Sequence, residues 1–238
     1  MFDRRTMIVA GAAALASPAL AQKGTAGSAG ATAGSAANQW FAVRGDEGQP
    51  VPNLRAPAEL VEDIEDLKGA IWAGPKPAAV QLVEFYDYNC PWCRAADAAR
   101  DALRRQKPEL RVGLVHNPIL SIASAQAAKV DLAVLQKYGA GASYALHKKL
   151  FASPGRIDGP RALETIAALG HDRAEIEKLA DSAEIGALMR QQMRLASSLG
   201  IMTTPSYVVA GAVILGFPGP KTLARIVDSA ARCGTIAC

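Results

Sequence analysis

The fold of this chain is decided by the stretch VQLVEFYDYNCPWCR, residues 80–94. It begins with an apolar run that predicts a strand buried on both faces, and it leads into residues 95–103, whose alanine-rich pattern predicts a helix. Pro91 suits the first turn of that helix. The pair Cys90 and Cys93 therefore lies at a helix start, where unpaired backbone N–H groups and the helix dipole favour a thiolate over a thiol.

Two cysteines separated by two residues have two common uses. They close a small disulfide ring that exchanges with other thiols, or they supply half of a zinc site, and the bare spacing does not separate these uses. The flanking sequence favours redox chemistry, because a buried strand runs directly into a helix, whereas zinc knuckles usually sit on hairpins with a second cysteine or histidine pair nearby. A static disulfide is disfavoured, because so small a ring at a helix start is strained and reducible.

Residues 1–21 have the pattern of a secretory signal peptide. Arg4 and Arg5 precede an apolar run over residues 7–16, and Ala-Leu-Ala at residues 19–21 forms a small-x-small cleavage site. The run is too short to span a membrane. The paired arginines resemble a twin-arginine export signal, with ordinary secretion as the alternative route. We expect a soluble protein in the periplasm, an oxidising compartment in which disulfides persist.

The composition is that of one globular domain behind a tail. Half of the 238 residues are hydrophobic and 20% are charged, and the net charge of +4 is too small to indicate nucleic-acid binding. Residues 22–37 are almost wholly Ala, Gly, Ser and Thr. Such a segment buries too little apolar surface to offset chain entropy, so we expect a flexible linker over residues 22–50 and an ordered domain over residues 51–238.

Hydrophobic periodicity predicts an alternation of strands and helices along that domain. The first predicted helix carries one apolar stripe, Leu60, Ile64, Leu67 and Ile71. The predicted elements are a helix over residues 57–73, a strand over 79–86, the helix that carries the dithiol and ends before Pro108, a strand over 110–115, helices over 123–138, 143–151, 160–169, 172–179 and 183–199, a hairpin of 206–209 with 213–215, and a helix over 221–231.

Two motifs and this order of elements resemble the DsbA-like family of thioredoxin-fold oxidoreductases. Thr204-Pro205 stands immediately before the hairpin, and residues 84–94 read EFYDYNCPWCR. The second motif is especially similar to the ScsC-type and Com1-type subgroup. The resemblance covers nearly all of residues 80–231. It implies an α/β architecture, a thioredoxin fold with an inserted all-helical domain over about residues 121–199.

The resemblance also implies roles for three residues around the dithiol. Cys90 matches the exposed nucleophile that forms a mixed disulfide with the substrate, and Cys93 matches the buried thiol that resolves it. Glu84 matches the family's buried acid, which accepts the proton of Cys93, and burial should raise its pKa. A buried acid that merely pairs with a lysine is the alternative for Glu84.

Four residues match the family's substrate groove: Pro91, Trp92, Thr204 and Pro205. Pro205 resembles the cis-proline that faces the dithiol, and Thr204 would offer backbone groups to an extended substrate chain. Trp92 is a rigid aromatic ring beside the groove, and such rings commonly contact a partner. The best-known oxidant of the family has a histidine in its place. We therefore expect a weaker oxidant, because cationic stabilisation of the Cys90 thiolate is missing.

The other candidate ligands and nucleophiles are Cys233, Cys238 and three histidines. In the periplasm the two cysteines should oxidise to each other, so we expect a structural disulfide, with a second redox or metal pair as the alternative. The histidines lie far apart without metal-ligand spacing, and we expect surface or capping residues: His116, His147 and His171. We expect no metal ion and no cofactor.

The function implied is a periplasmic thiol:disulfide oxidoreductase that donates the Cys90–Cys93 disulfide. Its expected partners are reduced or misoxidised exported proteins and a membrane redox partner. The alternatives are an isomerase or reductase kept reduced by that membrane partner, a metal-binding module and a holdase. Family isomerases oligomerise to present several dithiols, but residues 22–37 cannot build an interface and the apolar stripe of residues 57–73 is needed for packing. We therefore expect a monomer.

Overall fold

The computed structural model describes residues 40–65 and 67–238. The predicted signal peptide and residues 22–39 of the predicted linker lie outside the described residues. Among the described helices, none combines the length and hydropathy that a bilayer span requires. The elements, in chain order, are β1 (Asn53–Arg55), α1 (Ala58–Glu65), β2 (Ile71–Ala73), β3 (Val80–Tyr86), α2 (Pro91–Gln106), β4 (Leu110–His116), α3 (Ile122–Ala152), α4 (Gly159–Ala168), α5 (Arg173–Ala180), α6 (Ala183–Ser198), β5 (Ser206–Val209), β6 (Ala212–Leu215) and α7 (Pro220–Cys233).

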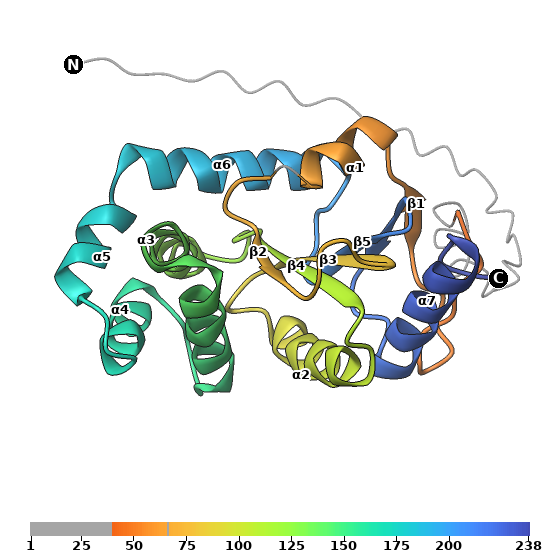
Figure 1. Cartoon of the computed structure of the whole chain (residues 1–238), viewed down its shortest axis with the longest axis horizontal. Coiled ribbons are helices and arrows are strands. Elements are labelled where there is room, and N and C mark those ends of the chain that lie inside the picture. The colour runs from red at the N-terminus through yellow and green to blue at the C-terminus, as the bar shows by residue number, and fades with distance from the viewer. Residues whose placement is uncertain (1–39, 66) are drawn as a thin grey trace, which may run out of the picture. The chain divides into compact units, whose positions relative to one another are not determined.

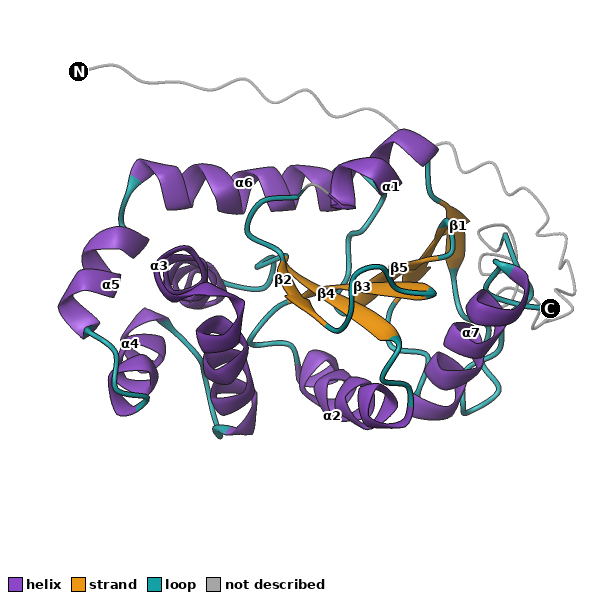
Figure 2. Ribbon diagram, in the orientation of Figure 1, coloured by secondary structure: helices purple, strands orange, loops and turns teal. Residues whose placement is uncertain are grey.

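A six-stranded mixed sheet in the order β1-β6-β5-β3-β4-β2 forms the centre of the domain (Figure 1). β3 runs parallel to β4 and antiparallel to β5. Figure 2 shows α2 and α7 on one side of the sheet and α1 and α6 on the other. Because helices cover both faces, β3 and β4 are buried along nearly their whole lengths, as the apolar run of β3 predicts.

Four helices, α3 to α6, separate β4 from β5 in the chain, as expected for the insertion. The longest, α3, changes direction at Gly139, whose φ of 83° and ψ of 178° are not helical. It therefore consists of two helices, which match the separate predictions over residues 123–138 and 143–151. α6 returns to the sheet, where Leu195 and Leu199 pack in the same apolar cluster as Ile64 of α1 and Val83 of β3.

Two predictions for the N-terminal part of the domain are wrong. Residues 40–50 of the predicted linker are packed on the domain: the Val43 side chain is buried, and the Val43 carbonyl accepts the N–H of Val51 at 2.9 Å. The sequence predicts a helix over residues 57–73, but α1 ends at Glu65. The last three residues of the predicted range, Ile71–Ala73, form β2, which pairs with β4. Gly69, with a φ of 82°, takes the left-handed conformation between these two elements.

Candidate active site

The dithiol lies where β3 leads into the first turn of α2. Cys90 is the N-cap residue of α2, and its Sγ accepts the N–H of Cys93 at 3.4 Å. The Cys90 thiol also donates to the Thr204 carbonyl at 3.1 Å. Both cysteines are free thiols. Cys93 is fully buried, and Cys90 keeps only 5% of its surface exposed, so the expectation of an exposed Cys90 is wrong: the Thr204 loop covers it.

The two thiols differ strongly in acidity. The hydrogen bond from the Cys93 side chain is the largest influence on the pKa of Cys90. Together with a hydrogen bond from the Thr204 side chain and the backbone N–H groups of the helix start, it lowers that pKa to about 6. Burial raises the pKa of Cys93 well above its usual range, and the nearby charges of Glu84 and Cys90 add to the rise. At neutral pH the pair therefore holds one thiolate, Cys90, and one thiol, Cys93.

Glu84 of β3 lies fully buried near this pair and has a cationic partner. Its Oε2 is 2.7 Å from Nη1 of Arg100, which is also fully buried, and its Oε1 has no hydrogen-bond partner among the described residues. Burial raises the pKa of Glu84, and the charge of Arg100 opposes that rise. The partner is thus an arginine of α2, the helix that carries Cys93, rather than a lysine.

Sequence reasoning missed Arg100, although a signal was present. Cys93, Ala96, Arg100 and Leu103 recur at helical spacing, and all four are buried on the face of α2 that packs against the sheet. A charged residue in such a stripe needs a buried partner of opposite charge. Glu84, which already stood out as a buried acid, was the available partner.

The prediction that His116 and His147 are surface or capping residues is wrong. Both are buried, with 1% and 0% of their surfaces exposed. They belong to a cluster of buried polar side chains behind the dithiol that is centred on Asp131 of α3. Asp131 accepts the hydroxyl of Tyr88 at 2.6 Å and that of Ser143 at 2.6 Å, and its Oδ2 lies 3.0 Å from Nε2 of His116.

His147 links this cluster to the ion pairs of α2. Its Nε2 lies 3.2 Å from Oδ1 of Asp97 and 3.1 Å from Nη2 of Arg100, and its Nδ1 lies 3.4 Å from the Tyr88 hydroxyl. Asp97 is paired with Arg100 and with Lys148 as well. Burial lowers the pKa of His147 to about 4, so the ring is neutral at neutral pH. The third histidine, His171, is half-buried and packs on the ring of Tyr138.

The predicted groove residues gather beside Cys90. The Thr204–Pro205 peptide bond is cis, and Trp92 is 64% exposed. A groove of about 610 Å³ is lined by Trp92 and Thr204, by the loop before α7, and by Asp46 and Glu47 from the N-terminal segment, which sequence reasoning did not connect with the site. Large hydrophobic side chains are exposed on three segments, at Trp92, just before and at the start of α3, and two residues before Thr204: Trp92, Ile119, Leu120, Ile122 and Met202.

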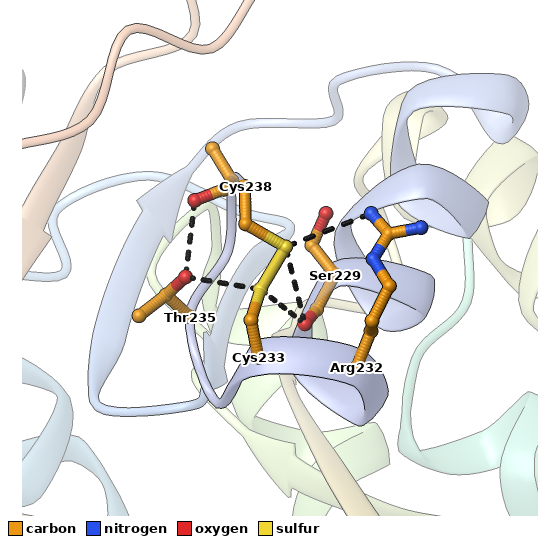
Figure 3. The surroundings of a disulfide bond; sticks show 6 residues. Ser229, Arg232, Cys233, Thr235 and Cys238 are labelled. Carbon is orange, nitrogen blue, oxygen red and sulfur yellow. Dashed lines mark hydrogen bonds between the residues drawn. A yellow bond between two sulfur atoms is a disulfide. The ribbon is translucent and has the colours of Figure 1, made fainter.

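Cys233 and Cys238 form the disulfide that the sequence predicts, with Cα atoms 6.7 Å apart (Figure 3). Ile236, inside the loop that they close, is buried in the apolar core. Cys233 ends the 14-residue helix α7, whose first residue, Pro220, lines the groove with Trp92. At about 1.5 Å per residue the helix spans about 21 Å, so the disulfide lies at the opposite end of α7 from the groove that Trp92 lines. Among the described residues, no three His, Cys, Asp or Glu side chains form a group that could hold a metal ion.

Comparisons with known proteins agree with this geometry. The family model of the DSBA-like thioredoxin domain matches residues 81–228. A thioredoxin-like oxidoreductase from Silicibacter pomeroyi DSS-3 is 31% identical, with 75% of this chain and 99% of that chain covered and a TM-score of 0.67. No curated protein sequence matches significantly.

Two further solved structures are similar in fold. The catalytic domain of Proteus mirabilis ScsC is 24% identical, with 73% of this chain and 97% of that chain covered and a TM-score of 0.65. The thiol-disulfide exchange protein alpha-DsbA2 from Wolbachia pipientis is 21% identical, with 72% and 94% covered and a TM-score of 0.64. The predicted thioredoxin fold with a helical insertion is confirmed.

Proposed function

Because this chain belongs to the family of DSBA-like thioredoxin domains and is a thiol:disulfide oxidoreductase, we propose that it donates the Cys90–Cys93 disulfide to reduced exported proteins. The observation that carries this proposal is the difference in acidity between the two thiols, with the pKa of Cys90 near 6 and that of Cys93 raised. A thiol of low pKa is a good leaving group, and a stabilised thiolate favours the reduced form of the pair. Both effects drive the disulfide toward the client.

The proposed reaction begins with a client thiolate that attacks Sγ of Cys90 in the oxidised pair. The bond between the two enzyme sulfurs breaks, its electron pair goes to Cys93, and Cys93 takes up a proton. A second client thiolate then attacks the client sulfur of the mixed disulfide, and Cys90 leaves as the thiolate. The client gains a disulfide and the enzyme pair is reduced by two electrons, which a membrane redox partner would remove.

Glu84 is the proposed proton donor and acceptor for Cys93. Its Oε1 is buried without a hydrogen-bond partner among the described residues, while Oε2 is held by Arg100. The free oxygen can hold a proton near Cys93, which is the thiol of the pair that must gain and lose a proton at neutral pH. Arg100 acts as a positioning residue that keeps the carboxylate available in an apolar surrounding.

The periplasm is the proposed compartment, and a monomer the proposed state. Residues 1–21 carry an export signal pattern, and the disulfide between Cys233 and Cys238 requires oxidising surroundings. The groove lined by Trp92 and Thr204, next to Pro205 in the chain, is the proposed client site, because an extended client chain could pair there with backbone groups of the Thr204 loop.

The test of this proposal traps the mixed disulfide. Cys93→Ser should accumulate covalent adducts with exported proteins on non-reducing gels, because the Cys90 thiolate still attacks client disulfides while the enzyme thiol that would release the client is absent, and Cys90→Ser should accumulate none. Equal adducts from both variants would contradict the assignment of the nucleophile. Thiol trapping in the native compartment then reads the redox state of the pair: an oxidised pair supports a donor, whereas a reduced pair supports an isomerase or reductase instead.

A further inference from the structure

A second cavity opens directly at Cys90. It has a volume of about 320 Å³ and shares no lining residue with the groove that contains Trp92. Two of its lining side chains are guanidinium groups, those of Arg94 and Arg156, and none is a carboxylate. The complete lining is Tyr88, Asn89, Cys90, Pro91, Arg94, Gly155 and Arg156. We call this cavity the arginine notch.

The two residues that flank the dithiol motif both bind the same segment of the helical insertion, residues 151–157. The Asn89 side chain donates to the carbonyl of Ile157 at 2.7 Å and accepts its N–H at 2.8 Å. Arg94 donates to the carbonyl of Ser153 at 2.7 Å and to that of Phe151, and its guanidinium lies 6.0 Å from the centre of the Phe151 ring. The segment that carries Arg156 is therefore fixed at both ends against the dithiol.

Arg156 itself is left without a partner in this arrangement. Gly155, with a φ of 77°, turns the chain immediately before it, and the Arg156 side chain is exposed. It makes no hydrogen bond or ion pair with another described side chain. The nearest acid along the segment, Asp158, is occupied, because its carboxylate caps α4 by accepting the N–H of Arg161 at 3.0 Å. A positive charge without a compensating carboxylate thus lies beside the reactive sulfur.

We propose that the arginine notch binds a carboxylate located close to the sulfur that exchanges with Cys90. A guanidinium presents paired N–H donors whose geometry matches a carboxylate, and Cys90 in the same cavity places a carboxylate bound there beside a sulfur that exchanges with thiols and disulfides. The ligand class is an anionic thiol or disulfide, either a small acidic thiol or a client cysteine with an adjacent acidic residue. This inference rests on the proposed exchange at Cys90.

The first test measures oxidation of the reduced protein by three small disulfides that differ in charge. The probes are glutathione disulfide, which is anionic, bis(2-hydroxyethyl) disulfide, which is neutral, and cystamine, which is cationic. In each reaction the Cys90 thiolate attacks one probe sulfur and releases one probe thiolate. Cys93 loses its proton, attacks Cys90 and releases the second. One probe disulfide is thereby reduced to two thiols while the enzyme pair is oxidised.

Arg156→Ala should slow the reaction with glutathione disulfide about fivefold at low ionic strength, the size expected of one pair of opposite charges about 4 Å apart in water. It should leave the neutral probe unchanged. Arg156→Lys should retain most of the rate, and Arg156→Glu should shift the preference to cystamine. At 1 M salt, where the Debye length is about 3 Å, these differences should vanish.

Arg105→Ala is the matched control, because Arg105 is an exposed arginine near the other end of α2 from Cys90. It should change none of the three rates. A loss in Arg156→Ala that is equal for all probes, or no loss for any, would overturn the notch as a carboxylate site. Failure of the unaltered protein to react with the neutral probe would instead overturn the proposed exchange, so the two failures are distinguishable.

A second arm separates the two sources of the carboxylate. Single-cysteine peptides with Asp or Asn beside the cysteine are supplied as disulfide-linked dimers and trapped on Cys93→Ser, with and without Arg156→Ala. The Cys90 thiolate attacks one peptide sulfur, a mixed disulfide forms, and the other peptide leaves as a thiolate. Faster trapping of the Asp peptide that depends on Arg156 identifies client chains as the source. If only the rate with glutathione disulfide depends on Arg156, the source of the carboxylate is a small acidic thiol. If the rates depend on the charge of the probe in neither arm, the proposal is refuted.

Discussion

Replacing Arg100 by methionine tests the buried ion pair on which the proposed proton transfer depends. Arg100 is fully buried, with Nη1 2.7 Å from Oε2 of Glu84, and no solvent reaches either group. Removing one partner of such a pair costs about 3–5 kcal/mol in free energy of unfolding, because an uncompensated charge stays buried. In a chain of this length that loss lowers Tm by about 6–20 °C. Chemical denaturation and thermal unfolding of the reduced protein give both quantities.

Two control variants separate the ion pair from general damage to α2. Arg105→Met removes an exposed arginine of the same helix and should change the free energy of unfolding by no more than about 0.5 kcal/mol. Glu84→Met combined with Arg100→Met removes both charges, and an apolar pair of similar volume is often neutral. The double variant should therefore be more stable than Arg100→Met alone. Asp97 keeps His147 and Lys148 as partners in every case.

Arg100→Met should also change the pH dependence of the reaction. Arg100 is the group that opposes the burial-induced rise in the pKa of Glu84, so without it the carboxyl stays protonated to higher pH. A protonated carboxyl cannot accept the proton of Cys93, and the rate at which Cys93 resolves a mixed disulfide should begin to rise only at higher pH. Single-turnover rates across pH measure this. An unmoved profile, or a stability loss no larger than that of Arg105→Met, would refute the reasoning.

Four further predictions concern other parts of the molecule. Trp92→His should lower the pKa of Cys90 below about 6, because an imidazolium stabilises the thiolate, and a thiolate absorbance titration measures it. The pKa of Cys90 is depressed on folding, so the reduced protein should gain stability over Cys90→Ser as pH rises from about 6 to about 8.5, and lose that gain as pH falls through 6, in denaturant titrations. Asp131→Asn should lower the free energy of unfolding by about 1–3 kcal/mol, since an amide nitrogen cannot accept the buried hydroxyl hydrogen bond that one of the two carboxylate oxygens accepts from Tyr88 or Ser143. Replacing Cys233 and Cys238 by serine should cost about 2 kcal/mol by the loop-entropy estimate while leaving exchange with the neutral disulfide unchanged.

The elements that could be predicted are those whose signal is local. The apolar run of β3, Pro91 at the first position of α2 and the periodic helices of the insertion each carry their pattern within about ten residues. β1 and β2 carry none: each has three residues, and each exists because an edge of the sheet is available to it, β1 beside β6 and β2 beside β4. Ile71 fitted a helical stripe, and strand pairing overrode that local preference.

The residues of the site fall into the same two groups, those with a local sequence signal and those without one. The cysteines and Glu84 could be located because they lie within one short motif that resembles the family's, and the Thr204–Pro205 peptide could be located because it stands immediately before the predicted hairpin. His116 and His147 could not, because their partners lie on other elements: Asp131 is on α3, and Asp97 is on α2. A histidine has no sequence signal that separates a solvated ring from a buried one, and only the fold supplies the acceptors.

These contacts make the helical insertion part of the reactive site rather than an appendage to it. The insertion supplies His147, which lies 3.1 Å from the arginine that holds Glu84, and segment 151–157, which is bound by the residues on either side of the dithiol. Without the insertion, Arg100 would lose its contact with His147, and Asp97 would lose its contacts with His147 and Lys148. The cavity at Cys90 would lose the lining that Gly155 and Arg156 supply. The surroundings of the Glu84–Arg100 ion pair and the positive charge beside Cys90 therefore depend on how the insertion packs. Under the proposed role of Arg156, substitutions in this segment would change the charge beside Cys90 while the strand and helix that carry the cysteines stay the same.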